Sequence, residues 1–342
     1  HTARADGADA HIAETMRRYL AEDVFQTIPD SFIYVERTLP DGRIRRGLVA
    51  ALDLEQYDFT GKLPASIRST EGTVEERLPP RVNIRRGAPL EMPHTLLLMD
   101  DRTDSVLSLA EKAKDALEKV YDFDLMLGGG HIAGWRVSGE TKAAVQSALD
   151  SLDNAALQRE KYGDAAKNGK LTFAVGDGNH SLAAAKRFWE EKRETLPENE
   201  RQTDPARFAL VEIENIHETS LDFEPIHRVI FDTDTSAFGS ELAAHRAEWE
   251  AKDKTLGERV AAAESFCRGY TAAHGGYIDY IHGDDTARAL GEKPNCAAVL
   301  LPPVEKSGLF LSVLKNGALP KKSFSMGNAR DKRYYLECRK IR

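Results

Sequence analysis

The chain has 342 residues, and 47 lysines and arginines against 55 aspartates and glutamates give it a formal net charge of −8 at pH 7. Its 41% hydrophobic and 30% charged residues exclude disordered, fibrous and membrane proteins. The longest apolar runs, 96–99 and 297–301, are far shorter than the roughly 18 residues that cross a bilayer. Three scattered cysteines form no disulfide framework or zinc pattern, which predicts a reducing, cytoplasmic location.

The acidic balance also bears on the expected partners. Binding to nucleic acid needs a dense basic surface, because neutralised phosphates supply most of the affinity. Here the basic groups, such as 43–46 and 85–86, are small and diluted by acids. We therefore expect a small-molecule substrate rather than nucleic acid or a membrane, and the residues indicate no oligomeric state.

The first half of the chain alternates between helical and extended patterns. Apolar spacing predicts a helix over 11–21, and alternation around Pro40-Asp41-Gly42 predicts a hairpin over 31–54. Residues 60–95 lack periodicity and are expected to form extended loops. A helix is predicted over 104–121, strands over 124–127 and 132–137, and a helix over 140–152.

The second half mixes both types without a repeat. A buried strand is predicted over 170–175 and a helix over 181–192; the remaining predictions are strands at 208–216, 225–231, 277–281, 297–301 and 333–340 and helices at 235–249 and 257–273. This irregular order favours an α+β fold with mixed, mainly antiparallel sheets and packed helices. We expect two regions, 1–165 and 166–342, with one compact unit as the alternative.

The sharpest local feature is a tight turn between the strand and helix predicted around residue 178. It comprises the consecutive residues Gly176, Asp177, Gly178, Asn179, His180 and Ser181. A glycine turn into a helix leaves backbone N–H groups unpaired at the positive end of the helix dipole, which favours an anion. Asp177 and His180 could then hold Mg²⁺, move a proton or contact a phosphate. The alternative is a purely structural turn, since Asp, Asn and Ser are also common helix caps.

A second group of polar residues lies in the expected loop region. It contains Arg68, Thr70, Glu71, Thr73, Arg77 and Arg81. The guanidinium groups could clamp phosphates while Glu71 acts as a base. A solvated loop with weak ion pairs explains the same residues equally well.

Other motifs are weaker or absent. The chain has no Walker loop, and the turn lacks the third glycine of a dinucleotide-binding fingerprint. Gly128-Gly129-Gly130-His131 favours a hairpin turn, with ligand contact by His131 as the alternative. His227 and Arg228 could face a phosphate where they open a strand, but no tight metal-ligand spacing surrounds them.

Several of these motifs together resemble one family. The run Phe173 to Lys186 resembles the signature of the bacterial and archaeal domain of unknown function 1015 family. So do the segments 67–74 with 79–81, 121–124 with 129–131, 225–228 and 319–324. The resemblance extends over most of the chain.

The turn also resembles, more distantly, the phosphate-binding strand–turn–helix element of the ParB and sulfiredoxin superfamily, which includes free-serine kinases. Asp177, Gly178 and His180 match that pattern, while Asn179 replaces a histidine and Ser181 replaces an arginine. The resemblance implies that nucleotide phosphates bind at this turn, with Arg68, Arg81 or Arg228 supplying the missing positive charge.

Together these features predict an enzyme that moves a phosphoryl group between a nucleotide, ATP or ADP with Mg²⁺, and a small serine-like metabolite. In this hypothesis Asp177 orients Mg²⁺ or the acceptor, His180 stabilises charge on the transferred group, and Glu71 is the base. Such a site requires Asp177, His180 and at least one of Arg68, Arg77, Arg81 or Arg228 to line one cleft. The alternatives are a phosphatase acting on a phosphorylated amino acid, a nucleotide-responsive regulator without turnover, and a scaffold.

Overall fold

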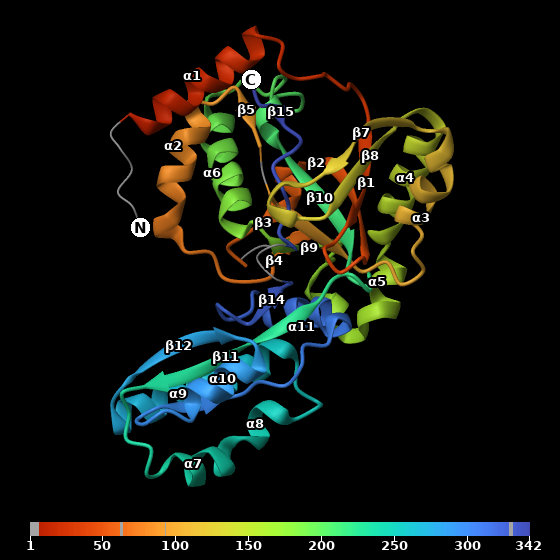
Figure 1. Cartoon of the computed structure of the whole chain (residues 1–342). Coiled ribbons are helices and arrows are strands. Elements are labelled where there is room, and N and C mark those ends of the chain that lie inside the picture. Colours follow the sequence, from red (N-terminus) through yellow and green to blue (C-terminus); the bar gives the residue numbers. More distant parts are fainter. Residues whose placement is uncertain (1–6, 62–63, 93, 328–330) are drawn as a thin grey trace.

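The computed structural model describes residues 7–61, 64–92, 94–327 and 331–342 (Figure 1). Its largest element is a mixed nine-stranded sheet in the order β3-β4-β9-β6-β10-β2-β1-β8-β7. The strands are β1 (Phe32–Thr38), β2 (Ile44–Asp53), β3 (Tyr57–Asp58), β4 (Ile67–Ser69), β6 (Leu96–Met99), β7 (Glu118–Asp124), β8 (His131–Val137), β9 (Phe173–Asp177) and β10 (Phe208–Asn215). The sheet takes strands from both sides of residue 165.

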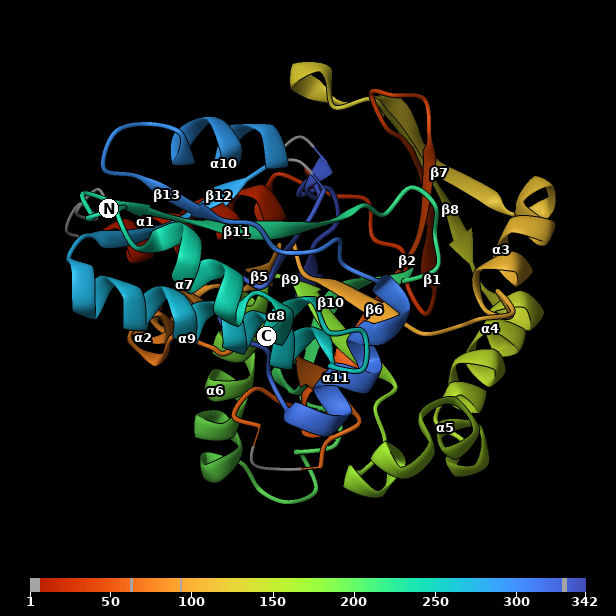
Figure 2. The same ribbon diagram turned by 90° about the horizontal axis from the view of Figure 1, so that it is seen from below.

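Helices cover this sheet on two sides (Figures 1 and 2). They are α1 (Ala8–Ala21), α2 (Leu78–Gly87), α3 (Leu107–Ala113), α4 (Gly139–Leu152), α5 (Ala155–Tyr162), α6 (Asn179–Thr195) and α11 (Leu309–Asn316). In β6, Leu97 and Met99 belong to the core cluster that contains α4 and α6 side chains, whereas Leu96 and Leu98 pack in the cluster that contains α11. The strand is uniformly apolar because both of its faces are buried.

A smaller α+β unit lies below the nine-stranded sheet in Figure 1. It contains β11 (Phe223–Phe231), β12 (Tyr277–His282), β13 (Ala297–Val299), β14 (Phe324–Met326), α7 (Phe238–His245), α8 (Ala247–Glu250), α9 (Leu256–His274) and α10 (Asp284–Gly291). The first residues of β11 pair with β14, and residues 226–231 pair with β12 and β13. A short pair of strands, β5 (Leu90–Glu91) and β15 (Arg339–Lys340), holds the C-terminal segment.

The fold is α+β, as predicted, and its most local predictions are confirmed. The hairpin over 31–54 forms as β1 and β2, with Ile33 opposite Val49. The buried strand and the following helix form as β9 and α6. Among the described residues, no helix combines the length and apolar character needed to span a bilayer.

Other predicted elements differ from the structure. The helix predicted over 104–121 ends early, since α3 stops at Ala113 and residues 118–124 form β7 instead, paired with β8 at the sheet edge. The loop predicted over 60–95 contains α2, which begins at Leu78. Its prolines at 79 and 80 lie in the first turn, where the missing N–H groups cost nothing. The helix predicted over 235–249 is divided into α7 and α8, and only β15 forms in the strand predicted over 333–340.

Candidate functional site in the cleft between the two units

The ends of β4 and β9 bring the two predicted groups of polar residues together. The strands run parallel, with Ser69 opposite Val175, so the residues that follow them emerge at the same edge of the sheet. Thr70 Oγ1 donates a hydrogen bond to the Val175 carbonyl oxygen at 2.7 Å and fixes this arrangement. A cleft of about 740 Å³ opens here between the large sheet and the smaller unit. Its lining includes the predicted residues Thr70, Glu71, Arg77, Gly176, Asp177, Asn179 and His180.

The turn from β9 into α6 requires glycine at position 178. Gly178 has φ +82°, and a Cβ atom there would lie 2.9 Å from Thr95 Cα. No side chain caps α6, and within the described chain the backbone N–H groups of Asn179 and His180 have no hydrogen-bond acceptor. Since a 17-residue helix carries a partial positive charge at its N-terminus, these two N–H groups are free to donate to an anion.

His180 faces the segment that carries the second predicted group. Its Nε2 atom accepts a hydrogen bond from the Val74 backbone N–H at 3.2 Å. Burial, together with the positive charges of Arg81, Arg77 and Lys321, lowers the pKa of His180 below its ordinary value. The ring is therefore neutral at pH 7, and with Nε2 accepting, its proton lies on Nδ1 as a hydrogen-bond donor.

Asp177 contacts the C-terminal segment of the chain. Its Oδ2 atom forms an ion pair with Lys332 Nζ at 2.9 Å, and its Oδ1 atom accepts the Gly178 N–H at 2.9 Å. In the described part of the chain, no group of three or more His, Cys, Asp or Glu side chains is arranged to hold a metal. Asp177 thus offers a single carboxylate to a cation, in competition with Lys332.

Glu71 is held by residues from the far end of the chain. Leu319 forms an isolated parallel β-bridge with Glu71. The Ser323 N–H donates a hydrogen bond to Glu71 Oε1 at 3.2 Å. Burial raises the pKa of Glu71 above its ordinary value, although the backbone N–H groups of Ser323, Lys322 and Phe324 and the charge of Lys322 oppose the change. The turn that makes these contacts places Lys322 in the left-handed region, at φ +61°. Glu71 is therefore a fixed carboxyl group with an increased affinity for protons.

The cleft has an excess of positive charge, although the whole chain is acidic. Its charged lining comprises Arg77, Lys321, Lys322 and Lys332 against Glu71, Asp177 and Glu224. The α6 N-terminus adds to the positive side. The cleft therefore suits an anionic ligand.

Four predicted residues lie near the cleft but have other surroundings. Arg68, on β4, turns away and donates to the carbonyl oxygens of Ala65 at 2.8 Å and Asn168 at 3.0 Å. Arg81 and Ser181 line a separate pocket on the other side of the first turn of α6. The fourth, Thr73, has a buried Oγ1 with no hydrogen-bond partner in the described chain.

The structure does not bring His131, His227 or Arg228 to the cleft. His131 lies exposed on the β7–β8 hairpin, with its ring nitrogens 2.6 Å from Asp122 and 2.8 Å from Asp124. His227 and Arg228 are fully buried inside the smaller unit. The His227 ring contacts Asp284 and accepts the Leu301 N–H, and Arg228 pairs with Glu264. These contacts hold all three residues away from the cleft; the sequence analysis named ligand contact as the alternative to a hairpin turn for His131 and as a possibility for His227 and Arg228.

Sequence reasoning missed several residues of the cleft. They are Glu224, Tyr280, His282, Lys321, Lys322 and Lys332. The two neighbouring lysines belong to the 319–324 segment that carries part of the family resemblance, so a signal for them existed. Nothing in the local pattern around the other four indicates that they lie beside the turn.

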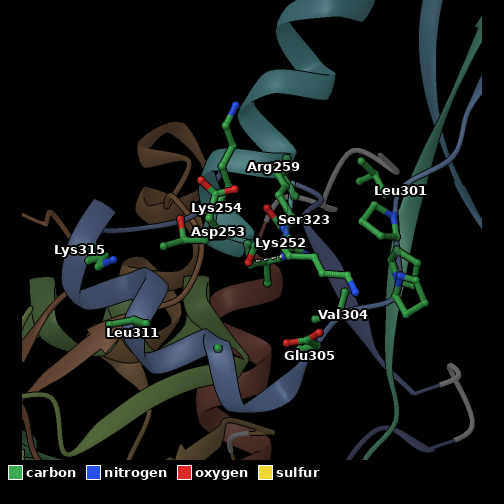
Figure 3. A pocket seen from close by; sticks show the side chains of 17 residues that line it. Lys252, Asp253, Lys254, Arg259, Leu301, Val304, Glu305, Leu311, Lys315 and Ser323 are labelled. Atoms are coloured by element: carbon green, nitrogen blue, oxygen red, sulfur yellow. Dashed lines mark hydrogen bonds between the residues drawn. The ribbon is translucent and has the colours of Figure 1, made fainter. Parts of the chain in front are cut away.

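A second pocket, of about 180 Å³, lies at the N-terminus of α9 (Figure 3). Figure 3 shows that Lys252, Arg259 and Lys315 surround it. The helix end here is already capped: Thr255 Oγ1 accepts the Glu258 N–H, and the Glu258 side chain accepts the Thr255 N–H at 2.7 Å. Because this N-terminus is satisfied internally, it differs from the uncapped start of α6 in the cleft.

Comparison with known proteins identifies one family. A family model described as "Protein of unknown function (DUF1015)" matches residues 2–340. Two solved structures are similar at 10% identity: a conserved hypothetical protein from Pyrococcus furiosus, with a TM-score of 0.36 over 82% of this chain and 91% of that chain, and SbnI with a C-terminal truncation from Staphylococcus aureus, with 0.38 over 86% and 87%. Curated protein sequences give no match. The structural likenesses are too distant to carry an argument, whereas the family match spans nearly the whole chain.

Proposed function

The chain belongs to the DUF1015 family, as its motifs predict, and from that premise we propose that the cleft transfers a phosphoryl group between a nucleotide and a small, serine-like hydroxylated metabolite. The observation that carries the proposal is the uncapped N-terminus of α6, which opens into a cationic cleft of about 740 Å³. A volume of this size lies in the range of small-molecule sites. Phosphoryl transfer depends mainly on positioning and on stabilisation of negative charge, which these residues provide.

In this proposal the phosphate groups bind at the start of α6. The N–H groups of Asn179 and His180 donate to phosphate oxygens, and Arg77 and Lys321 neutralise the remaining charge. The Nδ1–H of neutral His180 donates to an oxygen of the group being transferred. These donors are held in place by the turn and by the Val74 contact, so they need little reorganisation as charge develops.

Glu71 is the proposed base. The bond between the γ-phosphorus of ATP and its bridging oxygen breaks, a bond forms from phosphorus to the acceptor hydroxyl oxygen, and the hydroxyl proton passes to Glu71. The products are ADP and the phosphorylated acceptor. The raised pKa of Glu71 suits this role, since a base works best when its pKa approaches the operating pH.

Asp177 is the proposed protein ligand for Mg²⁺. Magnesium commonly uses one or two carboxylates and takes its other ligands from phosphates and water, so the single carboxylate fits. When bound, the ion neutralises charge on the phosphates. Lys332 Nζ, which lies 2.9 Å from Asp177 Oδ2, would compete with the ion for this carboxylate.

The test combines binding and turnover. Thermal unfolding is followed with ATP, ADP, phosphate, serine and phosphoserine, each with and without Mg²⁺, and ³¹P NMR follows phosphorylation of serine by ATP. A nucleotide at 100 times its dissociation constant should stabilise the protein by about 2.7 kcal/mol. His180→Ala should lose this shift, whereas His131→Ala, which changes an exposed histidine outside the cleft, should keep it.

The outcomes separate the proposal from its alternatives. Release of phosphate from phosphoserine would indicate that the protein is a phosphatase rather than a kinase. A nucleotide shift without any turnover would indicate a regulator. The absence of a shift with every phosphate compound would refute phosphate binding in the cleft.

A further inference from the structure

A separate pocket of about 370 Å³ lies on the other side of the first turn of α6. Its walls come from α1, α2, α6, β10, residues 90–92 and 94–95, and Tyr335. Most of the lining is apolar, including Met16, Ile84, Leu90, Met92 and Leu182. Several alanines among its lining residues leave the space open, since larger side chains there would fill it.

One charged side chain of this pocket has unused hydrogen-bond donors. Arg85 is 12% exposed, and its Nη1 atom lies 2.6 Å from Glu91 Oε2. Its Nε and Nη2 atoms are buried and have no hydrogen-bond partner in the described chain. These two N–H groups lie on the same edge of the guanidinium plane, which matches the two oxygens of a carboxylate.

The surrounding charges favour an anion at this edge. Glu91 is 5% exposed and is already held by Arg85 and by Arg339 Nε, which lies 2.8 Å from Oε1. Its Oε1 atom also accepts the Leu210 N–H at 2.9 Å. Arg81 lines the same pocket. Two guanidinium groups thus hold the one carboxylate, and Arg81 adds a further positive charge to the pocket lining, so a second negative charge would improve the balance.

We propose that this pocket binds a small organic carboxylate with an apolar body, held by a bidentate contact to Nε and Nη2 of Arg85. A carboxylate presents two oxygens to the guanidinium edge and one apolar substituent to the walls. A phosphate would leave its other oxygens against apolar side chains without partners, which is costly. The site needs neither a nucleotide nor the adjacent cleft, so it does not depend on the proposed phosphoryl transfer.

Isothermal titration with phenylacetate, hexanoate, the uncharged phenylacetamide and inorganic phosphate tests the proposal on the full chain. At least one carboxylate should bind with a dissociation constant of about 1 mM or lower. Phenylacetamide should bind more weakly than phenylacetate by about tenfold or more, because it lacks the charge-assisted bidentate contact.

Two variants and a matched control locate the site. Arg85→Lys keeps a positive charge for Glu91 but loses the paired N–H edge, and it should weaken carboxylate binding by about tenfold or more. Ile84→Trp should abolish binding by filling the pocket. Arg86→Lys should bind as the wild type does, because Arg86 is 52% exposed, pairs with Glu191 and does not line the pocket. Thermal unfolding of each variant confirms that it is folded.

Any one of four results would overturn the proposal. One is the absence of binding by either carboxylate at about 10 mM. Another is equal binding of phenylacetate and phenylacetamide, or unchanged binding in folded Arg85→Lys. The last is tighter binding of inorganic phosphate than of phenylacetate that is lost in Arg85→Lys, which would assign the pocket to a different anion.

Discussion

The turn that begins α6 makes a quantitative prediction about Gly178. In Gly178→Ala the new residue must keep φ near +82°, which costs roughly 1–2 kcal/mol for a residue with a Cβ atom. The Cβ atom would also lie 2.8 Å from Thr95 Oγ1 and 2.9 Å from Thr95 Cα, and such overpacking costs roughly 1–3 kcal/mol. The reduced freedom of the unfolded chain returns about 0.4–1 kcal/mol. We therefore expect a loss of about 2–4 kcal/mol in the free energy of unfolding.

Urea unfolding followed by tryptophan fluorescence measures this loss, because the fully buried Trp189 lies on α6 itself. Gly269→Ala is the matched control. Gly269 lies inside α9, needs no positive φ, and has no neighbouring atom within 4 Å of the place that a Cβ atom would take. Its replacement should stabilise the protein by up to about 1 kcal/mol. A loss below about 0.5 kcal/mol in Gly178→Ala would refute the described turn and, with it, the direction of the α6 N–H groups.

Three further predictions concern buried groups outside the cleft. Arg333→Ala should lower the free energy of unfolding in urea by about 3 kcal/mol, since it leaves the buried Glu212 without a partner that lies 2.7 Å away; an unchanged value would contradict this. Burial raises the pKa of Glu214 above its ordinary value of 4.5, against the opposing charge of Arg45, whose Nε atom lies 2.9 Å away, so the folded state binds a proton more tightly than the unfolded chain and stability should fall as the pH rises above about 4.5. Glu214→Gln should remove most of that slope, and an equal slope in the variant would show that other groups cause it. Burial also raises the pKa of the Cys267 thiol to about 12, so a disulfide reagent at pH 8 should modify it only after unfolding; rapid reaction of the native protein at Cys267 would contradict its burial.

The parts of the site that the sequence predicts are those fixed by local chemistry. The glycines around Asp177 require a turn, the apolar run before them requires a buried strand, and the periodic residues after them require a helix. This combination gives the order of β9, the turn and α6 without any tertiary information. The same holds for the hairpin around Gly42, whose turn residues fix the connection between two alternating strands.

The parts that the sequence does not predict depend on contacts between distant segments. Lys332 reaches Asp177 from the far end of the chain, and no local pattern encodes that pairing. His227 and Arg228 look like ligand contacts because their types are suitable, but only the packed structure shows them fully buried and hydrogen-bonded. Residues 118–124 form a strand because β8 supplies the pairing partner, which overrides a pattern that also fits a helix.

The most direct test of the central claim is an amide NMR titration of the ¹⁵N-labelled chain with pyrophosphate and with ADP. Phosphate binding at the start of α6 predicts that the largest shifts occur at the N–H groups of Asn179 and His180, with smaller shifts at Arg77 and Lys321. Both ligands should produce them, because the phosphate groups make the contact. Shifts confined to other parts of the chain, or none at saturating ligand, would contradict the assignment of this cleft as a phosphate site.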